Sequence, residues 1–370
     1  MATKTEFRIS DICRIIDEAF PLATQDSWDN SGLLVGNADE PVTGILIAVD
    51  IDAAALDEAI SKKCNLIVAH HPIMFRGLKR LTGSNAEQRL VERAIRNGIS
   101  LFAAHTCADK SCRGTSARLA QMLGLTDTRV LAPDDDSLFK LTVYVPNDYA
   151  DRVKDALFDA GAGHTGNYSH CCFESTGTGS FRALDGARPF VGEIGSTHHE
   201  AEMRIDTIVP RYKIRNAISA LCAAHPYEEP AYDIYPIANT SDSLGYGIVG
   251  NLPKPLSPTD FLSALRTTFN CKSIRYSEYS GTIQRVAICT GSGSEFIGKA
   301  IQSGAQAYVT ADIKYHQFAD CTNTLMITDI GHYESEELTK KLFMEILTEK
   351  ICNFVPCFLS ETQNNPVKYF

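Results

Sequence analysis

Short apolar runs alternate with amphipathic stretches along the first third of the chain. Runs without polar alternation predict buried strands at Ile45–Asp50, Leu66–Ala69 and Leu101–Ala104. Apolar residues at helical spacing predict helices between these strands, over Ala53–Lys63 and Ala86–Asn97. Strands that alternate with helices in this way are typical of a parallel α/β sheet.

Two of these strands end in imidazole side chains. His70-His71-Pro72 follows Leu66–Ala69, and His105 follows Leu101–Ala104. Because proline cannot extend a strand, the histidine pair should lie where the chain leaves the sheet, which is where α/β proteins bind ligands. Adjacent side chains on an extended chain point in opposite directions, so the pair could serve two metals, or one metal and a substrate. The alternative is a solvated pair of loop residues.

The pattern of elements changes after the acidic turn Pro133–Asp136. Alternating helices and antiparallel-looking strands predict a small ferredoxin-like α+β insertion over residues 133–238, before a linker at Asn239–Ser243. Its predicted elements are strands at Leu141–Val145, Cys171–Ser175, Val191–Ile194, Met203–Val209 and Ala231–Pro236, and helices at Ala150–Ala160 and Lys213–Ala224. Between the last helix and strand, His225–Glu229 could line a small-ligand or subunit interface, or form a proline-framed turn.

The last third of the chain repeats the strand–helix–strand scheme. Ser257-Pro258 is a typical helix start, with proline at the first helical position. Apolar runs after this helix predict strands at Val286–Thr290 and Ala307–Thr310. When the two segments are aligned without a gap, Ile45–His71 corresponds to Val286–Asp312, and His71 aligns with Asp312. We therefore expect two pseudo-symmetric α/β halves, residues 1–132 and 239–370, that form one metal-binding unit. The alternative is that any two β-α-β segments align this well.

Histidines and carboxylates also follow the later strands. Asp312 and His316 come after one of them, and Asp329, His332 and Glu336 come after the next. One helical turn would place His332 and Glu336 on one face, although an exposed pair has the same spacing. Two adjacent histidines, two carboxylates and a further histidine exceed the three protein ligands of an open mononuclear site and favour a dinuclear one. Ligands without thiolate favour two divalent ions of zinc, iron or manganese.

Composition narrows the class of protein further. The chain of 370 residues is 44% hydrophobic and 22% charged, which is ordinary for a soluble globular protein. Its net charge of −10 makes an extended nucleic-acid surface unlikely on electrostatic grounds, and no apolar run approaches the ~20 residues of a membrane span. Met1–Ser10 lacks the apolar stretch of a signal peptide, and the twelve cysteines form no Cys-x-x-Cys motif. We expect a cytoplasmic protein with reduced thiols.

Several motifs together resemble the Nif-three-like family, whose bacterial members are known as GTP cyclohydrolase I type 2 homologues. The resemblance rests on Trp28-Asp29-Asn30-Ser31-Gly32-Leu33-Leu34-Val35-Gly36, Ala69–Pro72, Ala104–Thr106 with Asp109, Thr310–His316, and Gly331–Tyr333 with Glu336. The segment His225–Pro230 resembles the PII/CutA-like domain inserted in longer members. One departure is Cys107, where many relatives carry asparagine.

This resemblance implies a toroidal homohexamer with a dinuclear metal centre in each chain. The ligands implied by position are His70, His71, Asp109, His332 and Glu336, and His105 would lie beside them as the catalytic proton-transfer or substrate-binding group. Further candidates for substrate binding are Trp28, Asp29, Asn30, Arg76 and His316.

The implied activity is hydrolysis of a nucleotide, GTP, with opening of the guanine imidazole ring at C8 and release of formate. The cations best placed to bind its triphosphate are Arg76, Lys79 and Arg80, which could equally form a solvated basic turn. Two other functions stay open: a non-enzymatic metal-binding or regulatory hexamer, and a dinuclear metal phosphoesterase.

Overall fold

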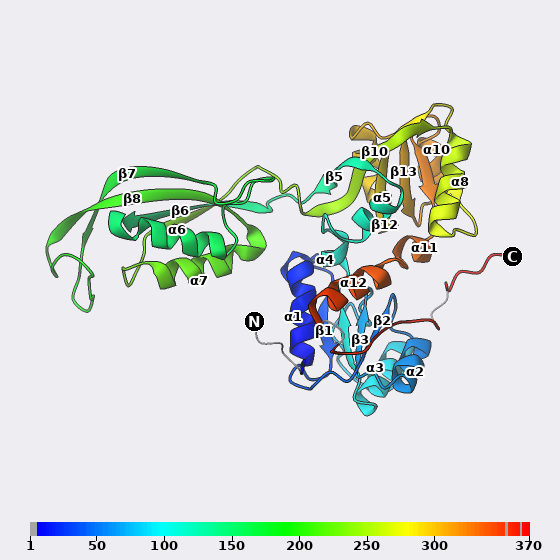
Figure 1. Ribbon diagram of the computed structural model, residues 1–370, viewed down its shortest axis with the longest axis horizontal. Helices are drawn as coiled ribbons and strands as arrows, with labels where there is room; N and C mark the ends of the chain where they lie inside the picture. Colours follow the sequence, from blue (N-terminus) through cyan, green and yellow to red (C-terminus); the bar gives the residue numbers. More distant parts are fainter. Residues whose placement is uncertain (1–5, 352–353, 363–364) are drawn as a thin grey trace. The chain divides into compact units, whose positions relative to one another are not determined.

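The computed structural model describes residues 6–351, 354–362 and 365–370 (Figure 1). Contacts divide the chain into two compact units, residues 1–132 with 243–370, and residues 133–242. The predicted boundary at residue 238 thus lies close to residue 242, and the division into three domains stays a prediction. Part of Met1–Ser10, for which no signal peptide was predicted, lies outside the described residues. Among the described helices, none has the length and apolarity needed to cross a membrane.

The first sheet of the larger unit carries the histidine pair. Its five strands have the order β1-β4-β3-β2-β15, and all neighbours are parallel except β1 and β4. Their bounds are β1 (Gly32–Val35), β2 (Ile45–Ala48), β3 (Leu66–Ala69), β4 (Ser100–Ala103) and β15 (Cys357–Leu359). The α/β class predicted from the first third of the chain is confirmed, whereas β15 was not predicted.

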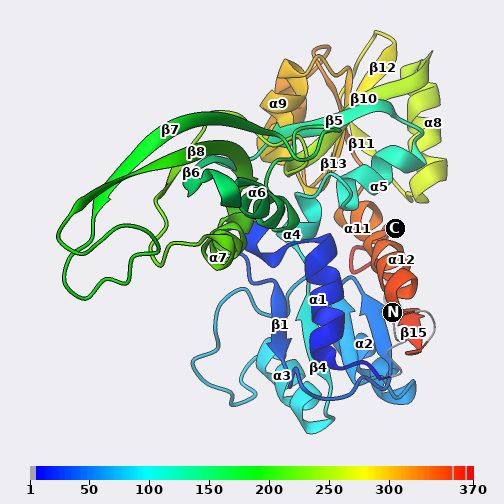
Figure 2. The same ribbon diagram turned by 60° about the vertical axis from the view of Figure 1, so that its left-hand side comes forward.

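Helices cover both faces of this sheet, which explains why its central strands are apolar throughout. On one face, α1 (Ile9–Ala19) packs with α12 (Thr339–Ile351), and the two helices lie side by side in Figures 1 and 2. On the other face lie α2 (Ala53–Ser61) and α3 (Ala86–Arg96). Alternate residues of β2 and β3 therefore point into two separate hydrophobic cores.

The second sheet of the larger unit has six strands in the order β11-β14-β13-β12-β10-β5. Their bounds are β5 (Thr126–Pro133), β10 (Gly245–Leu256), β11 (Arg275–Tyr276), β12 (Ile283–Ser292), β13 (Ala307–Ala311) and β14 (Met326–Asp329). One face packs against α5 (Thr115–Met122) and α8 (Pro258–Phe269), the other against α9 (Ile297–Gln302) and α10 (Tyr315–Asp320). As predicted, Ser257 caps α8 and proline occupies its first turn.

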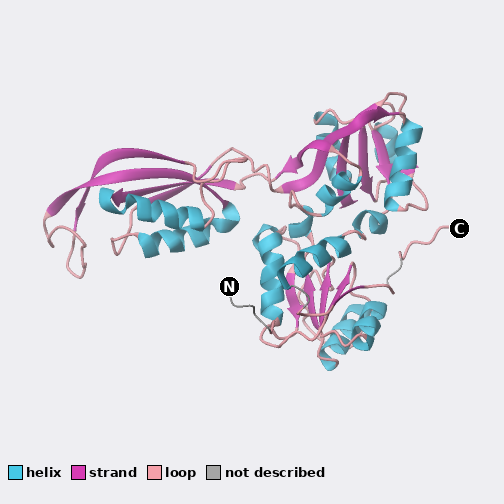
Figure 3. Cartoon of the chain, in the orientation of Figure 1, coloured by secondary structure: helices cyan, strands magenta, loops and turns pink. Residues whose placement is uncertain are grey.

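The unit of residues 133–242 has an antiparallel sheet in the order β7-β8-β6-β9. Its elements follow one another as β6 (Leu138–Pro146), α6 (Ala150–Asp159), β7 (Cys172–Arg182), β8 (Thr197–Pro210), α7 (Ile214–Ala224) and β9 (Tyr232–Pro236). Both helices cover the same face of the sheet (Figure 3).

The prediction of a strand at Val191–Ile194 is wrong, because these residues lie in the loop between β7 and β8. Gly192 and Gly195 adopt φ values of +84° and +82°, a conformation that makes turns and that regular strands do not use. Short helical turns complete the fold: α4 (Thr106–Asp109), α11 (His332–Glu336) and 3₁₀ turns at Leu22–Thr24, Asn147–Tyr149, Arg211–Lys213 and Ser294–Phe296.

Candidate metal centre

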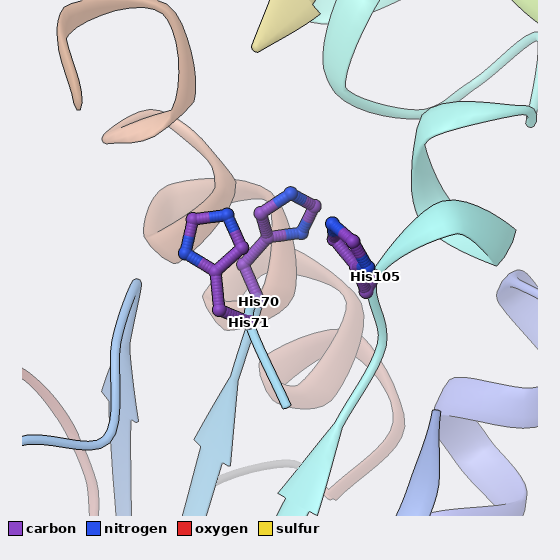
Figure 4. Close-up of side chains that lie close together, drawn as sticks. All are labelled: His70, His71 and His105. Carbon is purple, nitrogen blue, oxygen red and sulfur yellow. The ribbon is translucent and has the colours of Figure 1, made fainter. Parts of the chain in front are cut away.

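Three histidines meet at the carboxyl ends of β3 and β4. His70 and His71 follow β3, and His105 follows β4, so parallel pairing of these strands brings their ends together (Figure 4). The ring centroids of His70 and His105 are 5.2 Å apart, and those of His71 and His105 are 5.3 Å apart. The bend after β3 allows the two adjacent rings to lie 4.9 Å apart instead of on opposite sides.

A buried carboxylate from the far end of the chain joins this cluster. Glu336 belongs to the short helix α11, and its side chain is 3% exposed. Its Oε2 atom lies 3.0 Å from Nε2 of His71 and 3.0 Å from Nε2 of His332, while Oε1 lies 3.7 Å from Nε2 of His70. His332 and Glu336 share one face of α11, as their spacing predicted.

Each imidazole is held through its Nδ1 atom, which leaves Nε2 directed toward the cluster. Metal-binding histidines in proteins are commonly oriented in this way, because the Nδ1 contact fixes both the ring and its tautomer. The Nδ1 partners are the Ala104 carbonyl oxygen for His70 (3.1 Å), Asp50 for His71 (2.8 Å), Asp29 for His105 (2.9 Å) and Asp312 for His332 (2.7 Å).

Two buried polar atoms of the cluster lack a hydrogen bond of regular geometry with the described residues: Nε2 of His70, and Oε2 of Glu336 despite its two ion-pair contacts at 3.0 Å. Asp109 lies close by, with its Oδ1 atom 3.6 Å from Nε2 of His70 and accepting a hydrogen bond from Thr115. Buried polar atoms are normally satisfied. Atoms left unsatisfied within a set of imidazole and carboxylate donors fit a divalent metal ion.

The described residues contain two groups of three side chains with ligand atoms within 4.8 Å of one another. One group is His70, His71 and His105, and the other is His71, His332 and Glu336. The groups share His71 and together contain five side chains. This number of donor side chains exceeds the three protein ligands of a single open site.

Carboxylates control the protonation of the metal-free cluster. Burial lowers the pKa of His71, but interactions with Asp50 and Glu336 outweigh it and raise this pKa to about 10. Burial also lowers the pKa of His332, but interactions with Glu336 and then Asp312 outweigh it and raise this pKa to about 9. Burial raises the pKa of Glu336, yet its imidazole neighbours bring it well below the ordinary value. Without metal, these shifts favour an ionised Glu336 beside protonated His71 and His332.

The predicted substrate-binding residues fall in different places. The Trp28 ring is 58% exposed and lies 5.8 Å from the His105 ring, whereas the Asp29 side chain is buried behind that histidine. Asn30 donates a hydrogen bond to the Met74 carbonyl oxygen. Arg76 is exposed on the loop after His71-Pro72, and the exposed His316 packs on Tyr315 in α10.

Two residues of the site had no assigned role in the sequence analysis. Asp50 holds His71, although it lies after β2, and Phe75 places an exposed ring 5.6 Å from His105. Asp50 ends an apolar run, as the histidines do, so its position was a usable signal. Asp312, aligned with His71 in the predicted repeat, instead holds His332.

The fold and this cluster define an α/β protein with a histidine–carboxylate centre at its strand ends. The profile of the DUF34/NIF3 family, described as NGG1p interacting factor 3, matches residues 7–366, and the chain belongs to this family.

Individual relatives match over nearly the whole chain. A Bacillus subtilis protein named GTP cyclohydrolase 1 type 2 homolog is 37% identical over 368 residues, covering 97% of each chain. A Mycobacterium leprae protein of the same name is 38% identical and covers 89% of this chain and 87% of its own. The crystal structure of a Bacillus cereus protein related to NIF3 has a TM-score of 0.84 at 34% identity, covering 98% of this chain and 99% of its own.

Proposed function

We propose that the chain is a dinuclear-metal-dependent hydrolase that resembles GTP cyclohydrolase I type 2. The observation that carries this proposal is the convergence of imidazole Nε2 atoms on Glu336, with buried donor atoms left unsatisfied. The residues that would hold two divalent ions are His70, His71, Asp109, His332 and Glu336. Such ions would polarise a substrate and activate water for hydrolysis near neutral pH.

His105 is the group best placed to move a proton. Its Nδ1 atom is bound to Asp29, whose pKa lies well below the ordinary value: burial raises it, but the hydrogen bonds from His105 and Thr106 outweigh burial. An ionised Asp29 accepts a hydrogen bond from Nδ1 of His105, which leaves the Nε2 atom of the ring available for proton transfer. The neighbouring exposed rings of Trp28 and Phe75, 6.1 Å apart, offer an apolar surface for a planar base.

Formate release tests the GTP cyclohydrolase-like activity directly. Metal-loaded protein is incubated with GTP, and formate is measured with a coupled formate dehydrogenase assay. We expect formate from the native chain, little from His105→Asn and native rates from Glu337→Gln, an exposed neighbour of the site. A metal-loaded native chain that releases no formate would contradict this substrate assignment.

A non-enzymatic metal-binding or regulatory role is the second candidate. It is favoured by the exposure of Arg76, Lys79 and Arg80, the cations predicted to bind a triphosphate. This role predicts bound metal without turnover of GTP or of a phosphodiester panel. Turnover of the panel alone would favour the dinuclear phosphoesterase.

For the fold, we propose that residues 133–242 form a ferredoxin-like, PII/CutA-like insertion. The order of elements, strand, helix, two strands, helix, strand, supports this proposal. The pseudo-symmetric halves gain support from strand registers, because Ile45 pairs with Leu66 and Val286 with Ala307, both 21 residues apart. The toroidal homohexamer follows from the family resemblance, and light scattering of the purified chain tests it.

A further inference from the structure

The unit of residues 133–242 contains a groove of about 910 Å³, a size typical of small-molecule sites. It lies along β7 and β8 and is bordered by the loop that follows β7 and by residues 227–231. Tyr144 and Arg204 line it, while their strand neighbours Val143 and Ile205 belong to the hydrophobic core under the helices. The groove therefore occupies the face of the sheet that the helices leave uncovered.

Aromatic side chains form one wall of this groove. The ring centroids of Phe181 and Tyr227 are 5.8 Å apart, and those of Phe190 and Tyr227 are 6.2 Å apart. Phe190 is 48% exposed, on the loop between β7 and β8. An aromatic cluster beside an open groove presents ring faces that a ligand can contact.

A buried carboxylate without a cation partner lies against this wall. Glu202 is only 8% exposed and lines the groove, and its Oε1 atom accepts a hydrogen bond of 3.0 Å from the Tyr227 hydroxyl. Burial, and then this hydrogen bond, raise the pKa of Tyr227, so the hydroxyl stays a donor. Among the described residues, no lysine, arginine or histidine forms an ion pair with Glu202. Buried charges in proteins are normally paired.

The neighbouring strand β7 leaves space for this carboxylate at Gly179, two residues along β7 from Gly177, which pairs with Glu202. A Cβ atom added at Gly179 would lie 2.1 Å from Oε2 of Glu202, so a larger residue there would displace the carboxylate from this position. The nearest guanidinium on the same strand face, that of Arg204, is engaged by Asp206 at 3.1 Å. The negative charge of Glu202 thus stays available to a ligand in the groove.

We propose that this groove binds an organic cation, with a substituted ammonium group between Glu202 and the rings of Phe181, Phe190 and Tyr227. Aromatic faces attract such cations through their quadrupole, and a buried carboxylate adds a direct charge partner. The charges along the groove also favour a cation, because four carboxylates and only two guanidinium groups line it. A bare metal ion fits less well, since the described groups of three metal-ligating side chains all lie in the other unit. This inference goes beyond the proposed function and does not depend on the metal centre.

Calorimetric titration of the full chain with three ligands that share a phenyl ring tests the proposal: benzyltrimethylammonium, benzyl alcohol and benzoate. We expect the cation to bind at least tenfold more tightly than the alcohol, and benzoate not to bind. Tighter binding of benzoate, or equal binding of cation and alcohol, would overturn the proposal.

Variants locate the binding site. Glu202→Gln keeps an acceptor for the Tyr227 hydroxyl but removes the charge, and should weaken binding of the cation at least tenfold. Glu193→Gln removes the same charge from an exposed residue of this unit and should leave binding unchanged. Phe190→Ala, at a half-exposed position on the loop between β7 and β8, should weaken binding severalfold. Native affinity in both Glu202→Gln and Phe190→Ala would refute the assignment of the groove.

Discussion

Glu336, Glu202 and Glu58 are three buried carboxylates that are stabilised in different ways. Glu58 is satisfied within the chain, by Lys62 at 2.8 Å and by the hydroxyls of Ser360 and Thr362 at 2.8 Å. Glu336 is surrounded by imidazoles that can be either protonated or metal-bound. Glu202 has one neutral donor and no cation. The comparison separates a carboxylate that the chain itself satisfies from two for which we propose a ligand, a metal ion at Glu336 and an organic cation at Glu202.

Removing the charge of Glu336 should have the largest effect. Glu336→Gln takes away the anion that the three imidazoles share, and breaking a buried charge cluster of this kind costs about 3–5 kcal/mol. We expect the metal-free variant to unfold at lower urea concentration and to retain at most one metal ion per chain. Glu337→Gln, at the adjacent exposed position, is the control. Native metal content in Glu336→Gln would show that this carboxylate is not a ligand.

Substitution of a carboxylate that holds the Nδ1 atom of a histidine should have the next largest effect, a loss of metal affinity. Asp50→Asn leaves the His71 ring in place but removes the carboxylate that orients it and raises its basicity. Changes of this kind lower metal affinity by about 10- to 100-fold. Competition with a chromophoric chelator measures this loss. Asp57→Asn, which changes an exposed carboxylate on α2, should leave the affinity unchanged.

The sequence allowed much of this centre to be predicted, because its signals are local. His70-His71 at a strand end and the four-residue spacing of His332 and Glu336 follow from strand and helix geometry. The contact of Asp50 with His71 joins neighbouring strands and depends on their register, which the sequence pattern does not specify. Likewise, Asp29 was expected to touch a substrate, but tertiary packing buries its side chain behind His105.

The fold, too, could be predicted only where the sequence pattern is local and regular. The apolar run of β3 was predicted to the residue, whereas β10 was not predicted, because Gly245, Gly247 and Pro253 interrupt the strand pattern. The groove of residues 133–242 also could not be derived, since it brings together β7, β8 and two loops. The motif His225–Glu229 was expected either to line a small-ligand or subunit interface or to form a turn. It contributes Tyr227 and Glu228 to the lining of this groove.

Metal binding should release protons, which distinguishes the Glu336 cluster from the Glu202 groove. The folded-state pKa values of His71, about 10, and His332, about 9, lie above the ordinary 6.5. Protonation therefore stabilises the metal-free protein fully below pH 6.5, and this stability is lost as the pH rises through about 9 to 10. At pH 7.5, zinc should displace about two protons per chain. Calorimetry in buffers of different ionisation enthalpy counts them, and zinc binding without proton release would contradict the described protonation.

Loss of charge at Glu58 should lower the stability of the chain far more than loss of charge at Glu202. Burial raises the pKa of Glu58, but Lys62 and Ser360 outweigh it and bring the value to about 2. Its stabilisation is thus present above pH 4.5 and lost as the pH falls toward 2. Glu58→Gln should cost about 3 kcal/mol at pH 7, at 1.36 kcal/mol per pKa unit, and less at pH 3.

Glu202→Gln provides the contrast, because it keeps the Tyr227 hydrogen bond and removes an unpaired charge. Its free energy of unfolding should stay within about 1 kcal/mol of the native value. Urea unfolding at pH 7 and pH 3 measures both variants. A loss in Glu202→Gln as large as that in Glu58→Gln would mean that the chain itself satisfies Glu202.

The number of metal ions bound per chain tests the central claim most directly. Native mass spectrometry of the purified chain, reconstituted with zinc or manganese and freed of loosely bound ions, counts them without reference to any substrate. The account predicts two ions in the native chain and one or none after His70→Ala or Glu336→Gln. A native chain that binds no metal under these conditions would contradict it.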